Sequence, residues 1–227
     1  MHKLIVSILL ISILSCSTEE IYIDVYDPVQ EEIDSLNQRD TDVALIYSYL
    51  ESVGINYADT ISSGVYYSIT DYGEEQLYPK TNDIVSIHLA GYYTNDSIFF
   101  TNDSVDLVIF DTNIQSLAES FGYYDEDKYY SPITYTYNGL GSFFPVVSDH
   151  GYLAQLSDFK SALGLSLSKI SEGGSFKILM PSGNAYGKNG NTNTPEIPEN
   201  SILIFDISLI KIRKWIKSVL WQVILIN

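Results

Sequence analysis

Cysteine and histidine are scarce in this chain, which has one cysteine, Cys16, and three histidines, His2, His88 and His150. A single cysteine excludes a disulfide bond within the chain, and the wide spacing of the histidines fits no zinc-binding motif. His88 alone lies inside a strand-like run, where a core histidine is a commoner finding than a catalytic one. We therefore expect no metal centre.

Basic residues are also few: 12 lysines and arginines stand against 29 aspartates and glutamates, and the formal net charge is −17. Nucleic-acid binding depends on lysine and arginine side chains that neutralise phosphates, so DNA and RNA are excluded as partners. We interpret the acidic excess as a solvated surface. Hydrophobic residues make up 45% of the 227 residues, which is enough for a core in one or two domains and excludes a chain that is disordered throughout.

The first 15 residues, MHKLIVSILLISILS, combine one basic residue, Lys3, with an apolar stretch over residues 4–14. This stretch is shorter than the roughly 20 residues of a membrane-spanning helix, and the pattern is typical of a secretory signal. Cys16 directly follows Ile-Leu-Ser, which resembles the lipobox of bacterial lipoproteins, where the cysteine is acylated. The resemblance implies a lipid anchor at Cys16 in the bacterial cell envelope, at the outer membrane. It does not specify whether the protein faces the periplasm or the cell surface. A plain export signal that is cleaved elsewhere is the alternative.

Residues 16–39 are predicted to form an extended acidic tether, because the segment 17–40 carries eight carboxylates and one arginine. A helical lead-in is expected over residues 40–62. Asp40 or Thr41 can cap a helix whose apolar positions recur at helical spacing, and Gly54 suits its end. These apolar positions are Val43, Ile46, Leu50 and Val53.

From residue 64 onward the pattern changes to short runs rich in Val, Ile, Tyr and Phe, separated by Gly, Asn and Asp, as in β-strands. The runs are GVYYSIT, DIVSIHLAGYYT, SIFFTN, VDLVIF, ITYTY, FKILMPS and SILIFDISLIKI. Between them, FKSALGLSL at residues 159–167 predicts a short helix whose leucines face a sheet. We expect an α+β fold, with an antiparallel sheet and this helix, over residues 63–212. P-loop, dinucleotide-binding and GxSxG motifs are absent from the sequence, and no spacing of Ser, His and Asp indicates a catalytic triad.

Residues 165–212 read LSLSKISEGGSFKILMPSGNAYGKNGNTNTPEIPENSILIFDISLIKI. This order of helix, glycine turn, strand, PSxxAYG, long loop and IPxNxxLxFxVxL strand resembles the FKBP-type peptidyl-prolyl cis/trans isomerases. A second block, DIVSIHLAGYYTNDSIFF, is similar to the family's strand with His and Gly, followed by a hairpin and a Phe. The resemblance implies a sheet wrapped around a short helix, isomerase activity on Pro-containing polypeptide clients, and no cofactor.

The same resemblance implies a set of cleft residues. Its catalytic members would be Tyr186 from PSGNAYG, Phe99 from SIFF and Phe205 from ILIFD. Its substrate-binding members would be Ile197, Leu156, Phe159, Leu89, Phe100 and Ile133. The backbone N–H of Leu156 would donate to a client carbonyl. Considered one at a time, most of these residues are ordinary core positions, and only the ordered set indicates a cleft.

Isomerisation of this kind needs no acid, base or metal. Rotation about a peptide bond costs about 18 to 20 kcal/mol because amide resonance is lost at the twisted geometry. An apolar aromatic pocket that excludes water favours the twisted form over the more polar planar amide, and a donor held near the carbonyl or the proline nitrogen adds to this. Proline is the natural substrate because its cis and trans forms are close in energy.

Three positions depart from the family pattern. Phe100 stands where active members carry an aspartate that interacts with bound ligand, Leu89 replaces an aromatic residue, and Phe159 replaces a tryptophan. A one-residue shift of the hairpin, with Phe100 on the wall, still leaves no carboxylate after it. We therefore expect a cleft without this carboxylate. The alternatives to an active isomerase are a client-binding chaperone and a structural lipoprotein module with little turnover.

Two segments are additions to the family pattern. Residues 101–131 are expected to be an insertion, with a short helix around residues 114–121 and a tyrosine-rich acidic loop. Asp125, Glu126 and Asp127 in this loop could bind calcium, but the EF-hand spacing is absent and a solvated loop is the preferred interpretation. The tail, residues 213–227, is basic and then apolar, as in helices that lie on a membrane surface, and packing on the domain is the alternative.

Overall fold

The structure is a computed structural model that describes residues 27–74, 77–94, 107–138, 151–193 and 195–215. Its elements, in chain order, are α1 (Pro28–Ser52), β1 (Asp59–Thr60), β2 (Tyr66–Asp71), β3 (Ile84–Thr94), β4 (Val108–Thr112), α2 (Gln115–Ser120), β5 (Ile133–Thr136), the 3-10 helix η2 (Gly151–Ala154), α3 (Ser157–Leu167), β6 (Ser175–Met180), the 3-10 helices η3 (Ser182–Asn184) and η4 (Gly187–Asn189), and β7 (Ile202–Arg213).

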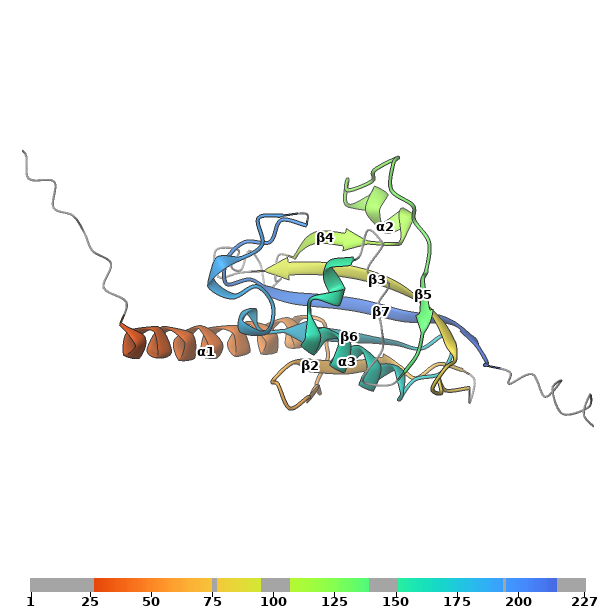
Figure 1. Cartoon of the computed structure of the whole chain (residues 1–227), viewed down its shortest axis with the longest axis horizontal. Coiled ribbons are helices and arrows are strands. Elements are labelled where there is room, and N and C mark those ends of the chain that lie inside the picture. Colours follow the sequence, from red (N-terminus) through yellow and green to blue (C-terminus); the bar gives the residue numbers. More distant parts are fainter. Residues whose placement is uncertain (1–26, 75–76, 95–106, 139–150, 194, 216–227) are drawn as a thin grey trace, which may run out of the picture.

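The strands form one antiparallel sheet in the order β1-β2-β6-β7-β3-β4, and β5 also pairs with β3. Its centre is the long pairing of β3 with β7, from Ile84 opposite Arg213 to Thr94 opposite Ile202. Figure 1 shows α3 lying across the strands of this sheet. The predicted α+β fold, an antiparallel sheet with a short helix against it and a helix at the N-terminal side, is confirmed.

Each face of the sheet is buried against a different helix. On one face, α3 packs against residues such as Leu89, Phe205 and Ile207 in the larger core cluster. On the other face, the C-terminal half of α1 packs against residues such as Ile202 and Ile204 in a second cluster. Because successive strand residues point to opposite faces, burial on both sides explains the almost unbroken apolar run at the start of β7.

The outer edge of β3 is shared by two strands. β5 pairs with Ile84–Ile87, and β4 pairs with Ala90–Tyr93. The side chain of Asn113 closes the gap between them, since its Oδ1 accepts from the Leu89 N–H at 2.8 Å and its Nδ2 donates to the Ile87 carbonyl at 3.0 Å. A buried amide thus takes the place of a strand backbone and satisfies the polar groups of β3.

The helix α1 begins earlier than expected. It starts at Pro28, so residues 28–39 are helical, and the prediction of an extended tether is wrong for them. The N-cap is Asp27, whose Oδ1 accepts from the backbone N–H groups of Val29 at 3.0 Å and Gln30 at 3.4 Å. An aspartate cap followed by proline is a known helix start, but the acidic composition concealed it. Figure 1 shows the first turns of α1 extending beyond the sheet.

Asp42 connects α1 to the loop that follows β6. Its side chain is almost fully buried, at 1% exposure, and its Oδ2 accepts from the Ser182 N–H at 2.8 Å and the Ser182 hydroxyl at 2.7 Å. Gln38 donates to the other oxygen at 2.9 Å. Ser182 belongs to the PSGNAYG segment, so α1 holds the loop that carries Tyr186.

The start of the C-terminal tail is held by the buried carboxylate of Asp83. The Lys214 ammonium donates to one of its oxygens at 2.8 Å and the Trp215 N–H to the other at 2.9 Å. Burial alone would raise the pKa of Asp83, but the hydrogen bonds from Lys214, Trp215 and Lys80 outweigh it and hold the pKa below its usual value. The resulting stabilisation is present at neutral pH and is lost as the pH falls through this lowered pKa. The predicted helix of the tail lies outside the described residues.

Replacing Asn113 by alanine should destabilise the fold. The change removes both bonds of the amide and leaves the Leu89 N–H and the Ile87 carbonyl without them, at a cost of about 1 to 3 kcal/mol for a buried polar group. Urea unfolding followed by circular dichroism measures this loss. Asn56→Ala, at an exposed position, is the control. Equal midpoints for the two variants would contradict the role of Asn113.

Replacing Asp42 by alanine should loosen the loop that carries Tyr186. The buried N–H and hydroxyl of Ser182 would lose their acceptor, and we expect a loss of about 1 to 3 kcal/mol. Amide hydrogen exchange should rise over residues 181–188 before the sheet unfolds. Asp34→Ala removes an exposed carboxylate of the same helix and is the control. Unchanged exchange in that loop would show that α1 does not hold it.

Candidate functional site

Five aromatic rings from five elements meet on the α3 face of the sheet. The Phe110 ring lies 5.9 Å from the Phe205 ring and 6.0 Å from the Tyr152 ring, both edge to face, and stacks on Tyr93 at 6.4 Å. The Phe159 ring lies 4.5 Å from that of Phe205. We call these residues the aromatic cluster. Tyr93 and Tyr152 are its partly exposed members, and the three phenylalanines are buried.

Gly91 makes this packing possible. It lies on β3 directly opposite Phe205 on one side and Asp111 on the other. A Cβ atom at Gly91 would lie 2.8 Å from Cζ of Phe110 and 3.2 Å from Cε1 of Phe205. The two rings can therefore meet over β3 only because this position has no side chain.

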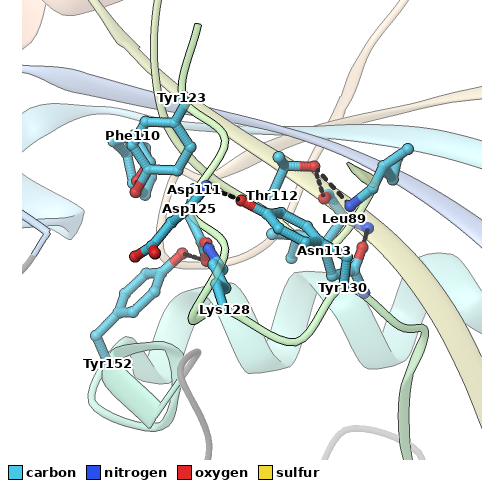
Figure 2. A network of polar contacts seen from close by, with 11 residues as sticks. Leu89, Phe110, Asp111, Thr112, Asn113, Tyr123, Asp125, Lys128, Tyr130 and Tyr152 are labelled. Atoms are coloured by element: carbon cyan, nitrogen blue, oxygen red, sulfur yellow. Dashed lines mark hydrogen bonds and ion pairs between the residues drawn. The ribbon is translucent and has the colours of Figure 1, made fainter. Parts of the chain in front are cut away.

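A buried carboxylate follows the phenylalanine of β4. Asp111 is 3% exposed, and Figure 2 shows its side chain between Lys128 and Tyr152. The Lys128 ammonium donates to Oδ1 at 2.6 Å, and the Tyr152 hydroxyl donates to Oδ2 at 2.7 Å. Both carboxylate oxygens are thus engaged within the protein.

Lys128 is held by the rings of Tyr123 and Tyr130, whose centroids lie 5.4 and 5.8 Å from its ammonium nitrogen. Both distances lie within the range of cation–π interactions. The Tyr123 hydroxyl donates to the Phe110 carbonyl at 2.6 Å, and the Tyr130 hydroxyl accepts from the Asp125 N–H at 3.0 Å. The loop between α2 and β5 is therefore attached to the strand that carries the carboxylate (Figure 2).

The tyrosine hydroxyls at the site stay protonated at neutral pH. Burial, and then the charge and hydrogen bond of Asp111, hold the pKa of Tyr152 well above its usual value. Tyr152 and Tyr186 are both partly buried and pack against the larger core. Burial also raises the pKa of Tyr186 itself. Both side chains can therefore act as hydrogen-bond donors and not as bases.

Most residues of the expected site lie in or against the larger core cluster, and a direct ring contact joins Phe159 and Phe205. Tyr186, between η3 and η4, is half-buried and packs against the larger core. That core contains the buried side chains of Phe205, Ile197, Leu156, Phe159, Leu89 and Ile133. Phe99, Phe100 and Cys16 lie outside the described residues, so their roles stay predictions.

Two of these positions have local contacts that matter for binding. The Leu156 N–H, expected to donate to a client, donates instead to the Leu153 carbonyl at 3.3 Å, a long bond that a client carbonyl would have to replace. Ile197 forms a bridge with Asn191, with bonds of 2.7 and 2.8 Å between their backbones, which closes the loop after Tyr186.

His88 does not belong to the site. It is half-buried on β3 between Ile87 and Leu89, which both face the larger core, so its side chain points to the opposite face. Burial lowers its pKa, which favours the neutral form. In the part of the chain that the structure describes, no three His, Cys, Asp or Glu side chains are grouped so as to hold a metal ion.

A carboxylate lies beside the aromatic cluster, where the sequence predicted none. Phe110 on β4 belongs to the cluster and Asp111 directly follows it, whereas residues 99–101 lie outside the described residues. The signal was present in the sequence, since VDLVIFDT contains a Phe-Asp pair inside a predicted strand. It was missed because SIFF follows β3 sooner and fits a short hairpin. Tyr152 and Lys128 were not predicted at all.

Two hollows of the surface lie away from the aromatic cluster. One, of about 510 Å³, is lined by residues of the α1–β1 connection, β2 and Lys169. The other, of about 1570 Å³, lies between α1 and the loop that contains Ser182. No member of the aromatic cluster lines either of these two hollows.

Residues 153–210 match the family model of the FKBP-type peptidyl-prolyl cis-trans isomerases. The matched segment contains Leu156, Phe159, Tyr186, Ile197 and Phe205, whereas β3 and β4 lie before it. Among curated proteins, no sequence matches this chain at a significant level.

Three solved structures are similar to parts of the chain. FkpA from Escherichia coli is 21% identical, with a TM-score of 0.41, over 82% of this chain and 63% of its own, so this chain spans less than two thirds of FkpA. The peptidyl-prolyl cis-trans isomerase from Pseudomonas syringae pv. tomato str. DC3000 is 16% identical, with a TM-score of 0.44, over 79% of this chain and 96% of its own. The N-terminal domain of FKBP42 from Arabidopsis thaliana is 14% identical, with a TM-score of 0.43, over 70% of this chain and 94% of its own. The likeness to the FKBP-type isomerases is therefore established at the level of sequence for residues 153–210.

Proposed function

We propose that this chain is a peptidyl-prolyl cis/trans isomerase that acts on unfolded or Pro-containing polypeptides in the bacterial cell envelope. One observation carries the proposal: residues of the FKBP-type segment and residues outside it meet in one site. Phe159 and Phe205 come from the segment, and Phe110 with Asp111 come from β4. Independent parts of the sequence thus converge on the combination of rings and carboxylate that the family resemblance implies.

The chemistry follows from the apolar character of the aromatic cluster. A prolyl ring that packs on the partly exposed rings of Tyr152 and Tyr186 loses water, and this disfavours the planar, more polar amide relative to the twisted one. The three phenylalanines of the aromatic cluster present no hydrogen-bonding group that would hold the planar form. The protonated hydroxyl of Tyr186 can donate to the client, and the Leu156 N–H can do so by exchanging its long bond to Leu153.

A client-binding chaperone with little turnover is the second candidate, and one observation favours it. Asp111 is 3% exposed and its oxygens already accept from Lys128 and Tyr152, so little of the carboxylate is accessible to orient a client. Only interactions that are stronger in the twisted state than in the planar state accelerate rotation. A site closed in this way binds apolar clients without that acceleration.

The location in the envelope is supported by the sequence of residues 1–16, with its short apolar stretch followed by Cys16. Within the described residues, no helix combines the length and the apolar character needed to cross a membrane. A lipid on Cys16 would hold the domain at the membrane surface, with α1 leading from the anchor to the sheet.

The isomerase proposal is tested with the full chain in detergent and a Leu-Pro peptide. Wild type should accelerate isomerisation, and Tyr186→Ala should lower kcat/KM while reducing stability by only about 1 to 3 kcal/mol. Tyr72→Ala removes an exposed tyrosine at the end of β2 and is the matched control. Binding without acceleration would favour the chaperone. Full activity of a folded Tyr186→Ala variant would remove Tyr186 from the site.

The anchor is tested by Cys16→Ala. We expect the wild type to incorporate labelled palmitate and to fractionate with membranes, because acyl chains stabilise membrane binding by about 0.8 kcal/mol for each buried methylene. The variant should lose the label and move to the soluble fraction. A variant that stays in the membrane fraction would point to the C-terminal tail as an anchor, and an unlabelled wild type would refute the lipoprotein assignment.

A further inference from the structure

We propose that Lys128 sets the charge preference of the site: by pairing with Asp111, it lets the site accept clients with an acidic residue next to the proline. This inference rests on the proposed isomerase function. It assigns a specific task to the loop between α2 and β5.

The ion pair between Lys128 and Asp111 is buried. The lysine side chain is 13% exposed and the aspartate side chain 4%, and the charged atoms are 2.6 Å apart. Exposed pairs are common and weak, but a desolvated pair persists only where both charges are compensated. The chain has only 12 basic residues against 29 acidic ones, and one of these few basic residues, Lys128, is largely buried beside the aromatic cluster.

The contacts of the loop converge on this lysine. Tyr123 and Tyr130 contact the ammonium with their rings, and Tyr124 stacks on Tyr130 at 5.6 Å. The Asp127 N–H donates to the side chain of Asp125 at 2.9 Å, which turns the chain just before Lys128. Figure 2 shows the lysine directed from this loop toward Asp111. The loop lies outside the FKBP-type segment and adds no strand to the sheet.

Asp111 is linked through the hydroxyl of Tyr152 to the surface on which a client would lie. Its Oδ2 is bonded to Tyr152, whose ring is a partly exposed member of the aromatic cluster. An unpaired carboxylate here would repel an acidic client residue and attract a basic one, because charges interact strongly where water is excluded. Paired with Lys128, the carboxylate presents no net charge, and the difference between acidic and basic clients becomes small.

The experiment compares capped peptides with Leu, Glu or Lys before proline, using the full chain in detergent. For wild type, kcat/KM should be similar for the Glu-Pro and the Lys-Pro peptide. In Lys128→Met the ratio of the Glu-Pro to the Leu-Pro value should fall at least about tenfold, and the Lys-Pro ratio should rise. In Asp111→Asn, which leaves the lysine charge alone, both ratios should move in the opposite direction.

Two controls separate the local charge from other effects. Lys211→Met makes the same change in net charge at an ion pair with Glu172 near the far end of β7, and it should leave the ratios unchanged. The double variant Asp111→Asn/Lys128→Met removes both charges and should restore the wild-type ratios. Because it buries no unpaired charge, it also serves if a single variant fails to fold.

Unchanged ratios in folded Lys128→Met and Asp111→Asn, or a double variant that keeps a charge preference, would overturn the inference. The proposed function would still stand if wild type isomerises the Leu-Pro peptide. If wild type isomerises no peptide, the proposed function fails instead. The dissociation constants of the same peptides are then compared, and their ratios decide whether Lys128 sets the charge preference of a binding site.

Discussion

The pairing of β3 with β7 is the contact on which the rest of the structure depends. It places Gly91 opposite Phe205, and the pairing of β3 with β4 places the same glycine opposite Asp111. Both buried faces of the sheet are built on these two strands, with α3 on one side and α1 on the other. A shift of one residue between them would turn Phe205 toward α1 and remove the aromatic cluster.

Several of the few basic residues of this acidic chain pair with carboxylates in the described residues. Lys128 pairs with Asp111 at the site, Lys214 with Asp83 at the start of the tail, and Lys177 with Asp206 under α1. Burial would lower the pKa of Lys177, but the neighbouring Asp206 outweighs it and raises that pKa. The same face holds Tyr92, whose pKa burial raises to about 12. In each of these three pairs the charge of a buried or partly buried group is compensated by its partner.

The candidate site combines residues of the segment that matches the family model with residues outside it. The segment 153–210 supplies the floor and one wall through α3, the Tyr186 loop and β7. Phe110 and Asp111 complete the wall, and the connection between α2 and β5 adds Lys128 with its tyrosines. In the proposed function, the matching segment would supply the apolar surface and the donors, whereas Lys128, outside it, pairs with the carboxylate.

The sequence by itself determined those elements and residues that depend only on nearby positions in the chain. The α+β fold, α3, β6, β7 and the positions of Tyr186, Ile197 and Phe205 could be predicted, because strand and helix periods and the spacing within one continuous motif are local properties. The start of α1 at Pro28 was also encoded locally, by its Asp27 cap, but the charge of the segment was given more weight.

Only the tertiary structure decided which residues complete the site. Tyr152 meets Asp111 across 41 positions and Lys128 meets it across 17, and the length of the connection after β3 hid the Phe110–Asp111 pair. Such contacts depend on how loops close and on which strand edge is free to pair, and these are properties of the folded sheet that no short stretch of sequence records.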